Sequence, residues 1–274
     1  MTAPTRRTLA VILWAVVLSL VWWSAARSQG EPPPYDPERA WYADQAALLD
    51  PRAYEFVSSH SWSRTVPEGE TWYALNLWRV RWQELTLGGF LRTPDANRPL
   101  LLPSGTLLRS YTGTTGDPST AFAYLCRPQA VFDIDARYTE DPKALYWARK
   151  DRLRSLPLRE INGRVGGGSA WNTTVLTPFP ATFDYGLAVE VSVYDAPWVG
   201  LAAVSETGSQ IVCNLQPEIN NNHTTRNAGV LCMPFSRARF PSIATHGGNN
   251  AGDSSSPCVL GLGQVLYVEL PGDW

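Results

Sequence analysis

The feature that most constrains the fold is a series of short runs in which apolar and polar residues alternate. The clearest run covers residues 187–194, LAVEVSVY, and has the two-residue period of a strand with one buried face. Similar runs, separated by Gly, Pro and Asn turns, cover residues 173–177, 198–205, 210–215, 229–234 and 259–270. Helices do not alternate with these strands, which argues against a parallel α/β fold. We therefore expect a mainly β protein with a β-sandwich or jelly-roll-like body, as one large module or two.

The first half of the chain mixes strand and helix signals. Residues 71–82, TWYALNLWRVRW, are rich in strand formers and predict one continuous strand. Pairs of Asp and Pro are start signals for helices, because Asp can cap a helix and Pro fits its first turn. They predict a few short helices or helical turns that begin near residues 36, 50, 117 and 141.

The order of these signals predicts four segments. Residues 1–28 form a signal peptide or a hydrophobic signal-anchor helix, and residues 29–40 a Pro-rich spacer. Residues 41–160 form a mixed β module with short helices. Residues 161–274 form a β-sandwich module or the second half of one sandwich, and a Gly-rich stretch at 166–169 marks the boundary.

The N-terminal segment predicts export. Arg6 and Arg7 precede an uncharged apolar run from Leu9 to Trp23, and small residues at 24–26 suit signal peptidase. The run is close to the shortest that can span a bilayer, so residues 8–26 would hold the protein in a membrane if they are not cleaved. The sequence leaves both outcomes open: a membrane-anchored protein with an extracytoplasmic body, or a secreted one.

Four cysteines fit an oxidising compartment, where an even number of well-spaced cysteines favours disulfides. We expect Cys213 to pair with Cys232, because the two bracket a polar loop between strand-like runs, and Cys126 to pair with Cys258. The three histidines show no ligand spacing, which disfavours zinc.

Two groups of residues are candidate ligand-binding sites. If residues 71–82 form one strand, Trp72, Trp78 and Trp82 share a face, which is either an aromatic platform for a ligand such as a sugar or part of the core. Polar loops on a rigid sheet often carry recognition, and the loop at 246–256 presents Asn249, Asn250 and Asp253.

Two charged segments have binding and structural interpretations. Asp133 and Asp135 belong to an acidic cluster whose oxygens could hold Ca²⁺, although the spacing is not that of an EF-hand and a solvated loop explains it equally. No other cofactor is predicted. The basic helix at 142–154 could contact anionic lipid or an acidic partner, or lie on the surface in solvent.

The sequence carries no motif that predicts catalysis. It contains no G-x-S-x-G nucleophile elbow, no H-E-x-x-H and no phosphate-binding glycine motif, so no catalytic residue is named. A formal net charge of −2 gives no basic field for nucleic acid. We expect a non-catalytic surface, envelope or virion structural or binding protein with a protein or carbohydrate partner. The alternative is a secreted carbohydrate-active enzyme or carbohydrate-binding module. A homo-oligomer is compatible with both.

Overall fold

The computed structural model describes residues 35–82, 99–110, 121–166, 173–194, 198–204, 210–214, 227–247 and 260–274. The chain divides into two compact units, Met1–Ala40 and Trp41–Trp274. The described residues of the second unit form four antiparallel sheets and a few short helices. The predominance of strands confirms the predicted mainly β class. The predicted N-terminal hydrophobic helix lies outside the described residues.

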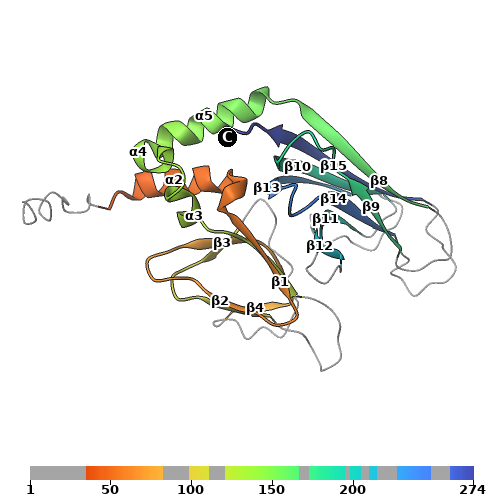
Figure 1. Ribbon diagram of the computed structural model, residues 1–274, viewed down its shortest axis with the longest axis horizontal. Coiled ribbons are helices and arrows are strands. Elements are labelled where there is room, and N and C mark those ends of the chain that lie inside the picture. Colours follow the sequence, from red (N-terminus) through yellow and green to blue (C-terminus); the bar gives the residue numbers. More distant parts are fainter. Residues whose placement is uncertain are drawn as a thin grey trace, which may run out of the picture. The chain divides into compact units, whose positions relative to one another are not determined.

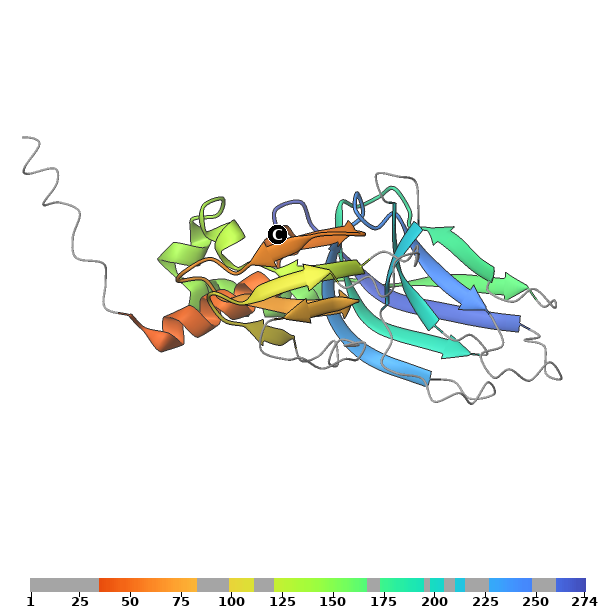
Figure 2. The same ribbon diagram turned by 90° about the horizontal axis from the view of Figure 1, so that it is seen from below.

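Eight strands of the second half form a two-sheet β-sandwich (Figures 1 and 2). They are β8 (Leu158–Gly166), β9 (Thr173–Pro178), β10 (Tyr185–Tyr194), β11 (Trp198–Val204), β12 (Gln210–Asn214), β13 (Asn227–Ser236), β14 (Ser242–Gly247) and β15 (Leu260–Leu270). One sheet has the order β13-β10-β15-β8 and the other β12-β11-β14-β9. The last strand in sequence, β15, is therefore an inner strand of the first sheet.

The two sheets bury one apolar cluster between them. Val265 of the first sheet and Leu201 and Ile243 of the second are fully buried members of this cluster. The alternation at 187–194 predicted one core face, and Val191 and Val193 do lie in this cluster, but Leu187 lies in another apolar cluster because the register of β10 shifts between Ala188 and Glu190. The sandwich core is thus built from both sheets, and the β-sandwich prediction is confirmed.

A pair of glycines allows the two sheets to approach closely at one point. Gly163 of β8 and Gly263 of β15 are register partners in the first sheet. A Cβ atom at Gly163 would meet the Thr245 side chain of β14, in the opposite sheet, at 2.1 Å from Oγ1. A Cβ atom at Gly263 would lie 2.5 Å from the same oxygen. The side chain of Thr245 is fully buried against this glycine pair.

The first half forms two smaller sheets. One has the order β1-β7-β3-β5 and the other β2-β6-β4. The strands are β1 (Tyr54–Ser59), β2 (Ser63–Thr65), β3 (Trp72–Trp78), β4 (Val80–Trp82), β5 (Leu100–Leu102), β6 (Leu107–Ser110) and β7 (Ala121–Cys126). The chain passes from one sheet to the other at Arg79, whose φ of 55° turns the backbone. The predicted continuous strand at 71–82 was therefore wrong, since it is two strands in different sheets.

A helix begins at three of the four Asp-Pro pairs, near residues 36, 50 and 141, while residue 117 lies outside the described residues, and the helices at 129–132 and 137–140 follow no such pair. The helices are α2 (Pro37–Leu48), the 3₁₀ helix η1 (Pro51–Ala53), α3 (Gln129–Phe132), α4 (Arg137–Glu140) and α5 (Pro142–Ser155). Asp50 caps η1 by accepting a hydrogen bond from the Arg52 amide, and Asp141 caps α5 in the same way through Ala144. Among the residues that the structure describes, no helix is both long and apolar enough to cross a bilayer.

Several strands were not expected from the sequence, among them β1, β8 and β14. The helical turn predicted from residue 50 ends at Ala53, and β1 follows at once. Residues 158–166, taken as part of a boundary region, form β8 and pair with β15 along their whole length. Strand β14 carries no alternation, because both its sheet partners and the opposite sheet bury it. In each case long-range pairing decides the structure.

Candidate functional site: a buried ionic clamp

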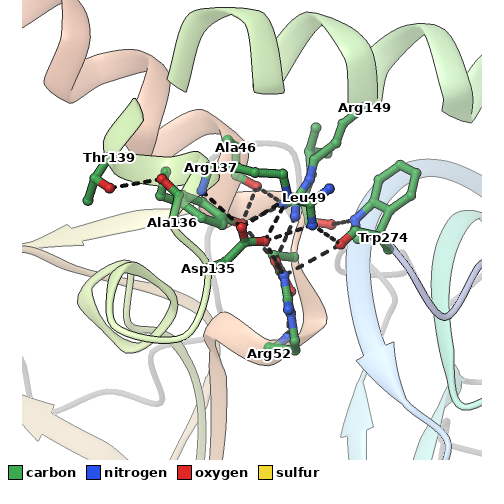
Figure 3. A network of polar contacts seen from close by, with 11 residues as sticks. Ala46, Leu49, Arg52, Asp135, Ala136, Arg137, Thr139, Arg149 and Trp274 are labelled. Atoms are coloured by element: carbon green, nitrogen blue, oxygen red, sulfur yellow. Dashed lines mark hydrogen bonds and ion pairs between the residues drawn. The ribbon is translucent and has the colours of Figure 1, made fainter. Parts of the chain in front are cut away.

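A network of charged and aromatic side chains ties the helices to the end of β15 (Figure 3). We call it the ionic clamp and define it by Asp50, Arg52, Asp135, Arg137, Tyr138, Arg149 and Trp274. Its residues come from η1 and the residue before it, from the turn before α4, from α4 and α5, and from the residues after β15. Segments far apart in the sequence therefore meet in one polar cluster.

Asp50 is the centre of the clamp and is fully buried. Its Oδ1 accepts hydrogen bonds from the Arg52 amide at 2.9 Å and from Arg52 Nε at 3.0 Å. Its Oδ2 accepts from Arg52 Nη2 at 2.7 Å, from the Tyr138 hydroxyl at 2.7 Å and from Arg149 Nη2 at 2.9 Å. Both carboxylate oxygens are thus fully engaged.

Asp135 repeats this arrangement with a second arginine. Its Oδ1 accepts from the Arg137 amide at 3.0 Å and from Arg137 Nε at 2.9 Å. Its Oδ2 accepts from Arg137 Nη2 at 2.7 Å and from Arg52 Nη2 at 3.0 Å. Two Asp-x-Arg sequences, 50–52 and 135–137, therefore form the same self-paired unit, and Arg52 joins them.

Trp274 attaches these units to the residues after β15. Its main-chain oxygen accepts from Arg137 Nη2 at 2.8 Å and from Arg52 Nη2 at 3.5 Å. Its indole Nε1 donates to the Leu49 carbonyl at 2.9 Å. The buried Arg149 guanidinium lies 5.5 Å from the Trp274 ring and 5.1 Å from the Tyr138 ring. Arg149 is therefore held by its carboxylate partner and by two aromatic faces.

Protonation states in the clamp are fixed by these contacts. Burial alone would raise the pKa of Asp50, but hydrogen bonds from Arg52 and the charge of Arg149 outweigh it and the pKa is lowered. Hydrogen bonds from Arg137, supported by Arg52, hold the pKa of Asp135 far below its ordinary range. Burial and the charge of Asp50 raise the pKa of Tyr138 far above its ordinary range. At neutral pH both carboxylates are therefore charged and the phenol is neutral.

Stability should accordingly depend on pH in the acid range. A carboxyl group whose pKa is lower in the folded state stabilises the fold above its unfolded value, ordinarily 3.8, and loses that contribution as the pH falls through the folded value. We expect the free energy of unfolding to be flat from neutral pH to about 5 and to fall below about 4. Urea unfolding across this range would show the drop, and Asp135→Asn should make the drop smaller. An equal drop in that variant would contradict the assignment.

This arrangement acts as a cross-link. Each carboxylate is saturated with donors, each arginine has a carboxylate partner, and the phenol donates to Asp50. A general acid or base needs a pKa near the working pH. The contacts in the clamp move the pKa values of Asp50, Asp135 and Tyr138 away from that pH. The clamp positions helices rather than reacting groups.

The tryptophans predicted as a platform do not share one face. Trp72 is buried in the cluster with Ala74 and Leu77, and its Nε1 donates to Glu70. Trp78 is partly buried and packs against the apolar cluster of the sandwich core, of which Leu75 is also a member. A register shift between Ala74 and Asn76 breaks the alternation that the prediction assumed. The side chain of Trp82 lies outside the described residues, and a ligand at these positions stays a prediction.

The predicted cation site has charged partners from the chain itself. Asp133 is exposed at the end of α3, while Asp135 is buried in the clamp. An ion at Asp135 would have to displace two guanidinium groups. Within the described ranges, no three His, Cys, Asp or Glu side chains gather as a metal site would require. Asn249, Asn250 and Asp253 lie outside those ranges.

The cysteine pairing stays a prediction. Cys126, which is buried in β7, and Cys232 of β13 are free thiols in the structure. The side chain of Cys213 and all of Cys258 lie outside the described residues. Each predicted pair thus includes one partner whose position is not described.

Sequence reasoning missed most of the clamp. Asp50 was recognised only as a helix start, and Asp135 only as a candidate cation ligand. The remaining members, Arg52, Arg137, Tyr138, Arg149 and Trp274, were not singled out. The one available signal was the repeated Asp-x-Arg spacing, because an Asp side chain that accepts from the amide two residues on also lies beside that residue's guanidinium.

Comparison with known proteins gives no family. No protein-family model matches the chain, and a search of curated proteins finds no relative. Among solved structures, the STIV MCP is 9% identical with a TM-score of 0.27, over 80% of this chain and 98% of that chain. A structure of infectious bursal disease virus, Gx strain, is 13% identical with a TM-score of 0.19, over 78% and 60%.

A third solved structure is of a different kind. The regulatory subunit of a cAMP-independent protein kinase A from Trypanosoma cruzi, bound to guanosine, is 7% identical with a TM-score of 0.18, over 88% of this chain and 86% of that chain. Likenesses as weak as these three carry no argument about fold or function. The function has to be argued from this molecule's own residues.

Proposed function

We propose that the protein is an exported, membrane-anchored structural or binding protein of a cell surface, envelope or virion, and that its β-sandwich builds or binds rather than catalyses. The predicted apolar segment at residues 8–26 supplies the anchor, and residues 29–40 the spacer. The sandwich and the helices clamped to it form the extracytoplasmic body. Its partner is a protein or carbohydrate on the same surface.

The observation that carries the proposal is the strand order of the sandwich. Numbered from β8, the sheets take strands six, three, eight and one, and five, four, seven and two. This is the order of a jelly roll, the architecture of many viral capsid and lectin domains. The strand order therefore supports a structural or binding role for the sandwich.

The ionic clamp supports a structural role as well. Trp274, four residues after the inner strand β15, contacts Leu49 just after α2, Arg137 of α4 and Arg149 of α5. Trp274 and Leu49 also share an apolar cluster with Leu187, Val268 and Leu270. Helices held by both ion pairs and apolar contacts form a rigid surface beside the sandwich, which is what a building block needs to present a constant contact face.

The first test is the fate of the N-terminus. We expect the intact protein, 30.3 kDa, in the membrane fraction of the expressing cell, with mass spectrometry showing that residues 1–26 are retained. Alkylation with and without reductant in the same measurement counts the disulfides. A soluble protein that lacks residues 1–26 would overturn the anchored form of the proposal and favour a secreted one.

A matched pair of variants makes this test specific. Val17→Arg places a charge within the predicted apolar segment, at a cost of about 2.5–3.5 kcal/mol for membrane insertion, and should move the protein out of the membrane fraction. Val17→Leu keeps the segment apolar and should leave the distribution unchanged. Equal distributions for both variants would mean that this segment is not the anchor.

A further inference from the structure

Helices α2 and α5 carry an aromatic and basic surface that the clamp does not use. We call it the aromatic patch and define it by Trp41, Tyr42, Lys143, Tyr146, Trp147 and Lys150. The Trp41 and Tyr146 ring centroids are 6.0 Å apart, those of Tyr42 and Tyr146 are 5.7 Å apart, and those of Tyr146 and Trp147 are 5.1 Å apart. The four rings thus form one connected group across the two helices.

Two of the aromatic rings in the patch are open to solvent. Trp41 is 51% exposed and Trp147 is 47% exposed, although both are large apolar side chains. They are two of six large hydrophobic residues among the described positions that are exposed to this degree. Two such side chains in one connected ring group mark a contact surface rather than a scattered exception.

The charges at the patch are positive. Lys143 Nζ lies 5.2 Å from the Tyr42 ring and Lys150 Nζ lies 5.6 Å from the Tyr146 ring. Of the acidic side chains of the two helices, Asp44 accepts from the Tyr73 hydroxyl and Asp151 pairs with Arg154, while Glu38 lies in the first turn of α2. The patch therefore offers cations beside aromatic rings, which suits a surface with negative charge and an apolar layer beneath it.

We infer that the aromatic patch docks on the anionic lipid surface of the membrane that anchors the chain. Trp and Tyr favour the headgroup region of a bilayer, because their rings are apolar and their N–H and O–H groups stay hydrated. Lysines near the surface are attracted by anionic headgroups. This combination of residues matches a lipid interface in both respects.

The short segment between the predicted anchor and α2 makes this membrane the nearest surface on which the aromatic patch can dock. This step rests on the proposed function, in which residues 8–26 lie in the bilayer. Residues 27–36 separate that segment from α2 and can span at most about 35 Å when fully extended. Trp41, in the second turn of α2, is therefore tethered within reach of the bilayer surface, and docking needs no free diffusion.

Footprinting of the full chain tests this inference. The protein is reconstituted in phosphatidylcholine vesicles with and without about a third of phosphatidylglycerol, and hydroxyl-radical oxidation of each side chain is measured by mass spectrometry. We expect Trp41 and Trp147 to be protected in the anionic vesicles and much less in the neutral ones. Leu101, which is exposed on β5, is the internal reference.

Charge reversal provides the specific control. Lys143→Glu with Lys150→Glu should shift the ratio of docked to undocked protein by on the order of tenfold or more and abolish the protection. Arg164→Glu with Arg239→Glu makes the same charge change on exposed residues of β8 and of the turn after β13, and should leave the protection intact.

The outcomes separate this inference from the proposed function. Protein that floats with the vesicles but shows no protection of Trp41 and Trp147 overturns the docking and leaves the anchor standing. Protection that is equal in both kinds of vesicle, or that survives reversal of both lysines, also overturns it and points to a second copy of the chain or another protein on the patch. Protein that does not float overturns the anchor and the docking together.

Discussion

Replacing Asp50 by asparagine should lower the free energy of unfolding by about 3–5 kcal/mol, a large part of the stability of an ordinary domain. Asparagine keeps the size of the side chain but removes its charge. Arg149, which is only 3% exposed, would then be buried without its carboxylate, and Arg52 would lose its closest partner. Leaving a buried charge uncompensated is the costly part of breaking such a pair. Urea unfolding followed by circular dichroism measures the loss.

Asp151→Asn is the matched control for this change. Asp151 pairs with Arg154 on the exposed side of α5, where both side chains are more than two-thirds exposed. Its loss should cost no more than about 0.5 kcal/mol. If Asp50→Asn and Asp151→Asn had equal effects, the clamp would not stabilise the fold.

Asp50→Asn combined with Arg149→Met should be less destabilising than the sum of the single changes, because no buried charge is left unpaired between them.

Gly163→Ala should destabilise the sandwich by about 1–3 kcal/mol, at the upper end of that range if the sheets cannot separate. The new Cβ would lie 2.1 Å from Thr245 Oγ1 and 3.0 Å from Thr245 Cβ, so the side chain and the backbone of β14 would both have to move. Gly263→Ala meets the same threonine and also Val199 Cγ2 at 2.9 Å. We expect a comparable loss there, measured as a lower midpoint of urea unfolding.

Two further variants test this explanation. Thr245→Ala removes the hydroxyl and methyl groups that face the glycine pair, so it should recover part of the stability lost in Gly163→Ala. Gly272→Ala adds the same methyl group where no atom lies within 4 Å and should change the free energy of unfolding little. If Thr245→Ala made the Gly163 variant no more stable, close approach of the sheets would not be the cause.

The sequence predicted the parts of this fold that depend on local pattern. Alternation located most strands of the sandwich, and Asp50 and Asp141 located helix starts, because both signals lie within a few residues of their effect. The β-sandwich body was expected from the spacing of the strands. The order of strands in each sheet was not, because it depends on pairings such as β8 with β15 that span about a hundred residues.

The clamp lay beyond sequence reasoning for the same reason. Asp50 and Arg149 are 99 residues apart, and Trp274 reaches Leu49 across 225. The acidic residues near 135 suggested a cation, and Asp135 does bind cations, but they are the guanidinium groups of Arg52 and Arg137. The aromatic face of 71–82 failed at a single register shift, since one extra residue moves every later side chain to the other face.

The position of β15 sets the order in which the chain can fold. It is synthesised last, yet it lies between β10 and β8, so neither strand has its full set of backbone partners before residue 260 is made. The clamp likewise waits for residue 274. Folds dominated by such distant pairings form slowly. A nascent chain that has not yet released β15 therefore exposes the facing edges of β10 and β8, which are open to pairing with another chain until β15 fills the place between them.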